Sequence, residues 1–433
     1  MPAFGFVADD LTGAADVLAQ SHRYGLEAAL AIGDAPLPAD TDVVGIAGPA
    51  RSLAGTEFDD LVRADLAGIA ALNPEVLLYK VCSTFDSSVT IGSIGRGIQL
   101  LHERFGLHGP VPVVPAQPGF GRYTAFSNHY AAHAGQVHRL DRHPVMSRHP
   151  STPMAEADLR RVLAEQLGSA ELPGAIHLPA YNDGSFKDAW AARRREPGAQ
   201  AFVVDAVNEL HLDTVAQALL REEHGHGPSI VVGSGGIMAA LARAVSDQAP
   251  RTPGPSQPAG PVLAVSASAS STTAEQINDA TSHGWEDVAV PAQLLQHADA
   301  AAVAALDERV ASALRAGRNV IVHTTRGAGD PRYGASKPAD AGYVGALIGG
   351  IAARMAAGGL TRDVAVCGGD TSSHALIAMG VRQLRVTDQF VTAGPVLRAD
   401  DTSAVAGCRL LLKGGQVGPP DILRRFAGQL PGS

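Results

Sequence analysis

Short apolar runs alternate along the chain with glycine-containing turns and with segments of helical spacing. Such runs, nearly free of polar side chains, are typical of strands buried on both faces of a parallel sheet. They lie at residues 4–7, 43–46, 76–79, 110–115, 201–204, 230–232, 262–265, 319–323, 364–366 and 410–412. The pattern predicts an α/β fold with two domains, each with a mainly parallel sheet flanked by helices.

A change of composition marks the boundary between the two domains. Residues 249–261 contain five prolines and two glycines, which favours an extended, exposed spacer. A chain of 433 residues is also too long for one ordinary core. We therefore predict a first domain over residues 1–248, a linker over 249–261 and a second domain over 262–433.

Capping residues indicate where two of the helices begin. Thr152 followed by Pro153 predicts a helix that starts there and ends at Gly168. Thr272 and Glu275 have the spacing of a capping box, which predicts the start of another helix.

Charge and composition argue against two classes of protein. A formal charge of -9 and a pI near 5.9 are unlike those of a nucleic-acid binder. No run of ~18 uncharged apolar residues occurs, so we expect no membrane span. The first strand begins without a basic leader, which favours a cytoplasmic protein.

Neither the cysteines nor the loop histidines indicate a metal site. Cys82, Cys367 and Cys408 are too scattered for a disulfide framework or a metal cluster. His143 and His149 lack a helical i, i+4 spacing and clustered partners. We expect both to be exposed loop histidines.

Polar side chains follow the first and third predicted strands. Asp9 and Asp10 come directly after the first strand, at the sheet edge where ligands bind in open parallel sheets. One of the two is expected to cap the next helix, and the other to contact a ligand. After the third strand, Lys80 suits a carboxylate, while other side chains suit hydroxyl groups, although an ordinary polar loop is an equal alternative. These other side chains are Ser83, Thr84 and Asp86. Arg122 follows a later strand and is a potential anion-binding residue.

In the second half, glycine and hydroxyl residues stand between strands and helices. Gly368 and Gly369 permit a tight turn, and Thr371 lies beside the unpaired N–H groups of a helix start. Such a start binds anions, phosphate above all. The hydroxyl-rich stretch 266–271 is a second start of this kind. The turn at 233–236 is similar, but close packing of helix on strand explains it equally well.

Common nucleotide and hydrolase fingerprints are absent from the sequence. It contains no G-x-x-x-x-G-K-[ST], G-x-G-x-x-G, G-x-S-x-G or H-E-x-x-H. Carboxylates and a lysine in one half, with phosphate-suited helix starts in the other, indicate phosphoryl transfer from a nucleotide with magnesium. Two alternatives stay open: a non-catalytic sensor of nucleotide or sugar acid, and a Rossmann-like dehydrogenase.

Together the motifs resemble the four-carbon acid sugar kinase family, ATP-dependent bacterial kinases of aldonate and 3-oxo-acid sugars. Residues 8–14 are similar to its opening A-D-D-x-T-G-A, and residues 80–87 to its K-x-x-S-T element in the form of the 3-oxo-tetronate kinase branch. Residues 266–270 resemble its serine-rich nucleotide loop, 368–372 its G-G-[ED]-T-S motif and 413–415 its K-x-G loop. The order and spacing agree over nearly the whole chain.

The resemblance implies an acid-sugar-binding first domain, a nucleotide-binding second domain and an active site in the cleft between them. Asp9 or Asp10 would activate the reacting hydroxyl, and Asp370 would orient Mg²⁺. Contacts to the acid sugar are expected from Lys80, Ser83, Thr84, Asp86 and Arg122. Contacts to ATP are expected from Ser266, Ser268, Ser270, Gly368, Gly369, Asp370, Thr371, Gly414 and Gly415. The partners are then the small-molecule acid sugar and ATP, and a homo-oligomer stays open.

Three departures from the family pattern affect the substrate. Ala267 stands where the family has glycine, Gly414 where serine is common among 3-oxo-tetronate kinases, and Gln416–Val417 where they have Asn-Phe. The substrate is therefore left open between a 3-oxo-tetronate and a branched relative such as 3-oxo-isoapionate.

Overall fold

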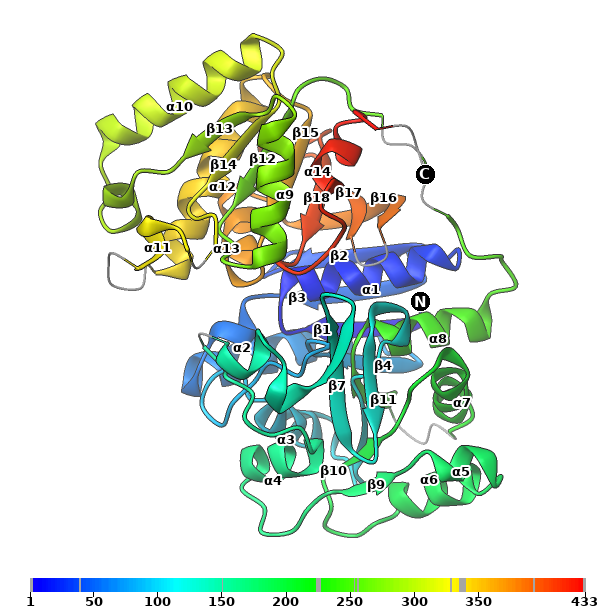
Figure 1. Ribbon diagram of the computed structural model, residues 1–433. Coiled ribbons are helices and arrows are strands. Elements are labelled where there is room, and N and C mark those ends of the chain that lie inside the picture. Colours follow the sequence, from blue (N-terminus) through cyan, green and yellow to red (C-terminus); the bar gives the residue numbers. More distant parts are fainter. Residues whose placement is uncertain are drawn as a thin grey trace. The chain divides into compact units, whose positions relative to one another are not determined.

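The protein divides into two compact units, Met1–Pro250 and Arg251–Ser433. The computed structural model describes residues 3–38, 40–149, 151–222, 227–252, 254, 257–327, 329–334, 340–391 and 394–430 (Figure 1). The side chains of residues 333, 334, 370 and 371 are outside this description. No helix in the described ranges is long and apolar enough to cross a membrane.

The first unit is built on a parallel sheet with the strand order β2-β3-β1-β4-β11-β5-β10-β9. All its neighbouring strands run in the same direction. The strands are β1 (Phe4–Ala8), β2 (Ala28–Ile32), β3 (Val43–Ala47), β4 (Val76–Lys80), β5 (Val111–Val114), β9 (Gly174–Ile176), β10 (Ala201–Val204) and β11 (Ser229–Gly233). Nearly every residue in these strands is buried, as their apolar sequences require.

Helices cover both faces of this sheet. From β1 the chain crosses towards β2, and from β3 it crosses in the opposite sense to β4, so right-handed connections place α1 and α2 on opposite faces. Helix α8 packs on α1 and α7 on α8, whereas α3 packs on α2 and α4 on α3 (Figure 1). The helices are α1 (Leu11–Arg23), α2 (Gly55–Ala70), α3 (Ile94–Phe105), α4 (Leu159–Leu167), α5 (Pro179–Asn182), α6 (Phe186–Arg194), α7 (Glu209–Leu220) and α8 (Gly235–Val245).

A small antiparallel sheet is inserted after β5. It consists of β6 (Arg122–Ala125), β7 (Asn128–His133) and β8 (Gln136–Arg139). Residue 128 is bridged to Asp158 just before α4, and Thr124 is bridged to Ala206 just after β10. These bridges fix the small sheet to the main body of the first unit.

The second unit has its own sheet, with the order β13-β14-β12-β15-β18-β17-β16. The strands from β13 to β18 in this order are parallel, whereas β17 and β16 are antiparallel to their neighbours. Its strands are β12 (Val262–Ser266), β13 (Glu286–Ala289), β14 (Val320–His323), β15 (Asp363–Cys367), β16 (Gln383–Val391), β17 (Gly394–Ala399) and β18 (Arg409–Lys413). The observed α/β architecture with mainly parallel sheets confirms the predicted fold class.

Six helices of the second unit lie in the described ranges. They are α9 (Ser271–Ser282), α10 (Ala300–Arg315), α11 (Pro331–Gly334), α12 (Ala341–Ala357), α13 (Asp370–Ala378) and α14 (Ile422–Phe426). Helix α12 packs closely on α13. A Cβ on Gly349 would lie only 2.4 Å from the carbonyl oxygen of Ala375. Glycine at this position therefore sets how closely the two helices approach.

Both predicted helix starts were wrong. Helix α4 begins at Leu159, where the Asp158 carboxylate accepts a hydrogen bond from Arg160 N at 3.0 Å, and not at Pro153. Residues before it bond to the small sheet and to the preceding turn instead: Ala157 O accepts from His129 N at 2.8 Å. Helix α9 begins at Ser271 with Ser270 as N-cap, and not at Thr272.

One buried carboxylate of helix α2 yields a stability prediction. Asp65 is 5% exposed and its Oδ2 has no hydrogen-bond partner among the described residues. Burial raises the pKa of Asp65 to about 7. Its ionisation therefore destabilises the fold as the pH rises from about 4 to about 7.

We expect Asp65→Asn to stabilise the protein relative to wild type increasingly over this pH range. The relative gain should reach on the order of 2–4 kcal/mol at pH 8, compared with pH 4. Thermal denaturation at several pH values measures it, and the exposed Asp60→Asn on the same helix is the control. A pH-independent difference would contradict the assignment.

Candidate active site

The first group of functional side chains lies where four strands of the first unit end. Ala8 is paired with Ala47 and Lys80, and Lys80 with Gly233, so these residues mark one common edge. Asp9 follows directly after β1. Strands β2 and β3 lie on one side of β1, and β4 lies on the other, so the strand order switches at β1. Open α/β sheets bind ligands at the carboxyl ends of the strands at such switch points.

The two neighbouring aspartates have different surroundings. Asp10 is the N-cap of α1: its carboxylate accepts hydrogen bonds from Gly13 N at 2.8 Å and from the Thr12 hydroxyl. Arg51, four residues beyond β3, forms an ion pair with the same carboxylate. Asp9 is 6% exposed, and its Oδ1 has no hydrogen-bond partner among the described residues.

These surroundings separate the pKa values of the two carboxyl groups. Burial raises the pKa of Asp9 to about 7, with Arg51 opposing and Asp10 adding to the shift. Burial also acts on Asp10, but Arg51, Lys80 and the hydrogen bond from Thr12 hold its pKa below the usual value. Asp10 is thus fixed as a charged cap, while Asp9 is poised to take up or release a proton near neutral pH.

Lys80 ends β4 and is 2% exposed. Its ammonium donates a hydrogen bond to Val81 O at 2.8 Å. Burial raises the pKa of Asp9 and of Asp16, and the charge of Lys80 opposes both shifts and helps to hold the pKa of Asp10 low. Asp16 is held from the other side, because Gln117 Nε2 donates to its two carboxylate oxygens at 3.1 and 3.0 Å. Lys80 therefore balances a cluster of buried carboxylates.

The loop after β4 presents hydroxyl and carboxylate groups at the same edge. Thr84 Oγ1 donates to Asp86 Oδ1 at 2.6 Å, and Asp86 Oδ2 lies 4.0 Å from Arg51 Nη1. Ser83 is half-buried. Phe85 has a φ of +59° and is fully buried, so the core of the first unit holds the loop in a left-handed turn that a bulky residue rarely adopts.

Arg122 starts the small sheet and is 5% exposed. Its Nη1 donates to Phe120 O at 3.0 Å and to Ala132 O at 3.2 Å, and the guanidinium lies over the Phe120 ring. The prediction that His143 is an exposed loop histidine was wrong, because its side chain is fully buried. The segment 140–148 folds back in two short 3-10 turns, which a pattern of charged residues and prolines did not indicate.

The strand ends of the second unit form another aligned edge. Ser266 is paired with His323 and Cys367, and Cys367 with Lys413. Beyond Ser266, the chain turns towards α9 through hydroxyl contacts: Ser268 N donates to Ser266 Oγ at 3.4 Å, and Ser270 N donates to Ser268 Oγ at 3.3 Å.

The glycine turn after β15 leads into α13. Gly368 has a φ of +145°, and Gly369 occupies the N-cap position without a side-chain cap. Ser372 Oγ donates to Gly368 O at 2.6 Å, which closes the turn. The side chains of Asp370 and Thr371 lie outside the described residues, so their predicted contacts stay predictions.

Gly414 and Gly415 follow Lys413 at the end of β18. A Cβ on Gly415 would lie 2.7 Å from Ser268 Oγ, so this glycine packs directly against the serine turn. Gly415 O accepts from Thr273 Oγ1 at 2.8 Å, and Lys413 Nζ lies 3.2 Å from that hydroxyl. Lys413 is fully buried, and burial lowers its pKa. The turns at 266–270 and 413–415 are thus one connected group.

The structure brings the predicted residues into two groups and adds one that sequence reasoning missed. Arg51 received no role from the sequence, although its place just after a strand end was a usable signal. Within the described ranges, no group of three or more His, Cys, Asp or Glu side chains could hold a metal ion. Cys82, Cys367 and Cys408 are free thiols.

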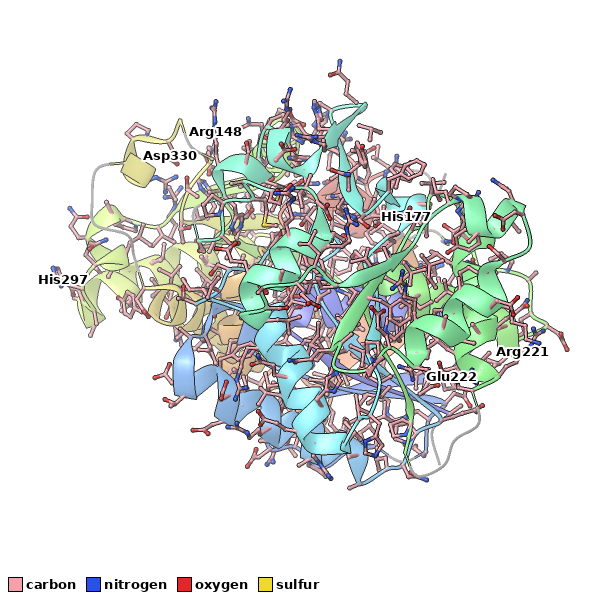
Figure 2. The ribbon with its side chains drawn as sticks, turned by 90° about the horizontal axis from the view of Figure 1, so that it is seen from below. Arg148, His177, Arg221, Glu222, His297 and Asp330 are labelled. Atoms are coloured by element: carbon pink, nitrogen blue, oxygen red, sulfur yellow. The ribbon has the colours of Figure 1, made fainter. Side chains whose placement is uncertain are left out.

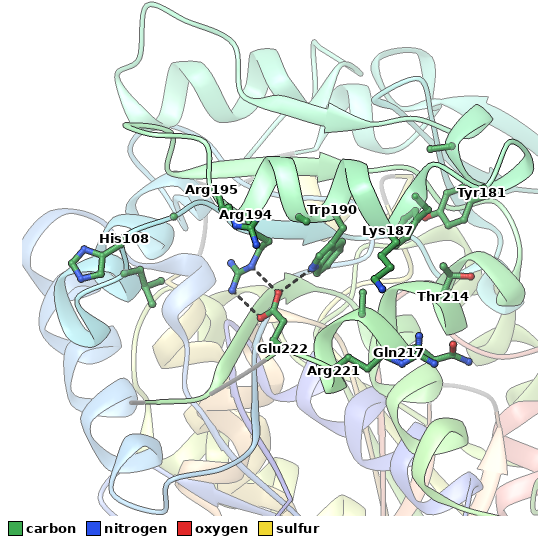
Figure 3. A pocket seen from close by; sticks show the side chains of 17 residues that line it. His108, Tyr181, Lys187, Trp190, Arg194, Arg195, Thr214, Gln217, Arg221 and Glu222 are labelled. Atoms are coloured by element: carbon green, nitrogen blue, oxygen red, sulfur yellow. Dashed lines mark hydrogen bonds and ion pairs between the residues drawn. The ribbon is translucent and has the colours of Figure 1, made fainter. Parts of the chain in front are cut away.

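A cavity of about 760 Å³ lies elsewhere in the first unit, between α6 and α7 (Figure 3). Inside it, Glu222 accepts hydrogen bonds from Trp190 and, at 2.7 and 2.9 Å, from Arg194 (Figure 3). Figure 2 places Arg221 and Glu222 together just beyond α7. None of the predicted site residues lines this cavity.

Comparison with known proteins identifies both units. Residues 4–241 match the model of a sugar-binding N-terminal domain, and residues 263–423 match that of a nucleotide-binding C-terminal domain. Two solved structures, from Salmonella typhimurium and Haemophilus influenzae, share the fold with TM-scores of 0.78 and 0.70 at 21% and 22% identity. In each case the match covers 98% of this chain, and 98% and 99% of the respective solved chains.

Curated relatives are similar over almost their whole length. The 3-oxo-isoapionate kinase of Paraburkholderia graminis is 34% identical, covering 95% of this chain and 91% of the relative. The 3-oxo-tetronate kinase of Cupriavidus necator is 29% identical, covering 100% and 98%. The D-threonate kinase of Bordetella bronchiseptica is 28% identical, covering 98% and 97%. The chain therefore belongs to the acid sugar kinase family that joins a sugar-binding N-terminal domain to a nucleotide-binding C-terminal domain.

Proposed function

We propose that this protein transfers the γ-phosphoryl group of ATP to a hydroxyl of a 3-oxo sugar acid, with Asp9 as the general base. One observation carries the assignment of the base: Asp9 is buried at the end of β1, has an unpartnered carboxylate oxygen and has a pKa raised to about 7. Asp10 is a poorer base, because its oxygens already accept hydrogen bonds and an ion pair.

In the proposed reaction, the Asp9 carboxylate accepts the hydroxyl proton as the hydroxyl oxygen attacks the γ-phosphorus. A new P–O bond forms to the sugar acid, and the bond to the leaving ADP breaks. Arg51 and Lys80 keep the Asp10 carboxylate charged. Ser83, Thr84 and Asp86 are proposed to bind the other hydroxyl groups of the sugar acid.

The serine and glycine turns of the second unit are proposed to bind ATP. N–H groups at the starts of α9 and α13 suit phosphate oxygens. Mg²⁺ is proposed to enter with ATP and to neutralise charge on its phosphates, and Asp370 is the proposed protein group that orients it. Kinases hold Mg²⁺ largely through phosphate oxygens and water, so a cage of protein ligands is not required.

The proposed substrate class is a four-carbon 3-oxo acid or a branched relative. Support comes from the 34% identity with a 3-oxo-isoapionate kinase and the lower identities with 3-oxo-tetronate kinases. A coupled ADP-release assay with 3-oxo-isoapionate, 3-oxo-tetronates and D-threonate tests the proposal. Binding of ATP and acid without ADP release would overturn it and indicate a sensor.

The raised pKa of Asp9 predicts a pH profile. Because the carboxyl group must be ionised to act as a base, kcat/KM should fall below about pH 7. Asp9→Asn should lower kcat at least about 100-fold. The matched control is Asp65→Asn, which removes the other carboxyl group with a pKa near 7 and should leave the profile in place. Near-wild-type turnover of Asp9→Asn would show that another group is the base.

Close packing of Gly415 on Ser268 predicts a selective defect in nucleotide binding. Gly415→Ala places a methyl group 2.7 Å from Ser268 Oγ, so the serine turn must shift. We expect KM for ATP to rise roughly 10-fold, equivalent to about 1.4 kcal/mol, with little change in KM for the acid. Gly260→Ala, whose Cβ meets nothing within 4 Å, is the control. Equal changes in both KM values would argue against a specific ATP contact.

A further inference from the structure

One face of the small sheet is lined by arginine and histidine. The register pairs Arg122 with Ala131, Thr124 with His129 and Ala131 with His138, and residues paired across strands share a face. A hydrogen bond of 3.0 Å between Thr124 Oγ1 and His129 Nδ1 agrees with this arrangement. This face, which we call the histidine face, thus carries Arg122, Thr124, His129, His133 and His138.

The histidine face packs against the loop after β4, which contains Ser83 and is proposed to bind the hydroxyl groups of the sugar acid. His129 Nε2 donates to Ser83 O at 2.8 Å, which joins β7 to the loop after β4. At its other end, the rings of His133 and His138 lie 5.4 and 5.8 Å from that of His143. The histidine face therefore extends from the loop after β4 to the buried His143.

His143 has a proton donor that no described residue uses. Its Nδ1 accepts hydrogen bonds from Val145 N at 3.1 Å and Met146 N at 3.2 Å, so in the neutral ring the proton is on Nε2. Burial lowers the pKa of His143 to about 4, which keeps the ring neutral. Nε2 is buried and has no partner among the described residues. An unused buried donor is costly and indicates a missing acceptor.

Arg122 also keeps unused donors. Its Nη1 serves backbone carbonyls, whereas Nε is buried without a partner. Nη2 makes no hydrogen bond to any described residue. Burial lowers the pKa of this guanidinium and the charge of Asp86 raises it, but no described carboxylate forms an ion pair with it. A nearly buried arginine without an ion-paired carboxylate is well suited to bind an anionic ligand.

The other cations of the site are already committed. Arg51 is paired with Asp10 and lies 4.0 Å from Asp86, and Lys80 faces the buried aspartates. A sugar acid brings one further negative charge into this surrounding. Its carboxylate must avoid the aspartates and needs a cation that is not yet neutralised.

We infer that Arg122 and His143 form the carboxylate subsite, and that they rather than Lys80 select an acid as the substrate. This inference rests on the proposed function. Arg122 Nη2 and Nε bind the carboxylate, and His143 Nε2–H donates to it once the half-buried ring of His133 or His138 moves aside. The carboxylate is thereby held on the histidine face, which leaves a hydroxyl for Asp9.

The test compares the acid that the wild-type protein phosphorylates fastest with the primary amide of that acid. Arg122→Gln should lower kcat/KM for the acid roughly 100-fold, mainly through KM, and change that for the amide less than about twofold. His143→Leu should lower kcat/KM for the acid roughly 10-fold, and His143→Gln, which restores an N–H donor, should recover most of it. Arg142→Gln, on an arginine whose side chain is 79% exposed, is the matched control.

Thermal denaturation and KM for ATP report whether each variant is folded. An Arg122→Gln protein that is folded and as fast as wild type with the acid overturns the inference, and so does an equal loss with acid and amide. A Lys80→Met protein that loses the preference for acid over amide, while Arg122→Gln keeps it, also overturns it. If the wild-type protein phosphorylates none of the acids, the proposed function itself fails.

Discussion

Two adjacent carboxylates at one strand end impose the electrostatic constraint on which the first unit depends. Both carboxyl groups are buried, and two negative charges cannot lie side by side there without compensating groups. Arg51 and the N-terminus of α1 stabilise the charge on Asp10, whereas at Asp9 burial outweighs the opposing effect of Arg51. Asp9 then keeps the proton affinity that burial gives it. The division of labour between neighbours of identical chemistry thus comes from their surroundings, and from an arginine on another strand connection.

The second unit meets a similar constraint with the opposite charge. Lys413 lies under the serine and glycine turns with no exposed surface and hydrogen-bonds to Thr273. No carboxylate forms an ion pair with it among the described residues. Burial lowers the pKa of this lysine, and an anion bound at the two helix starts would favour its protonated form.

The sequence was sufficient to predict the fold class and the local position of most site residues. An aspartate, lysine or glycine that directly follows an apolar run lies at a strand end. Parallel strands end at a common edge, so these residues come together there. The ion pair of Arg51 with Asp10 and the buried position of His143 were not predictable in this way. Each depends on a contact between segments distant in sequence, and the segment around His143 has no periodic pattern. The prediction of the start of α4 was wrong for the same reason. Thr152 and Pro153 favour a helix locally, but the residues before Leu159 hydrogen-bond to the small sheet instead.

The left-handed turn at Phe85 ties the chemistry of the site to the core beneath it. Its aromatic ring is an integral part of the hydrophobic cluster under β4, while its neighbours Thr84 and Asp86 present polar groups at the surface of the sheet edge. A backbone held in an unfavourable conformation by packing keeps that conformation only as long as the packing persists. Volume changes in the core around Phe85 would therefore shift the proposed substrate contacts at Thr84 and Asp86, which gives core residues that never touch a ligand a route to influence specificity.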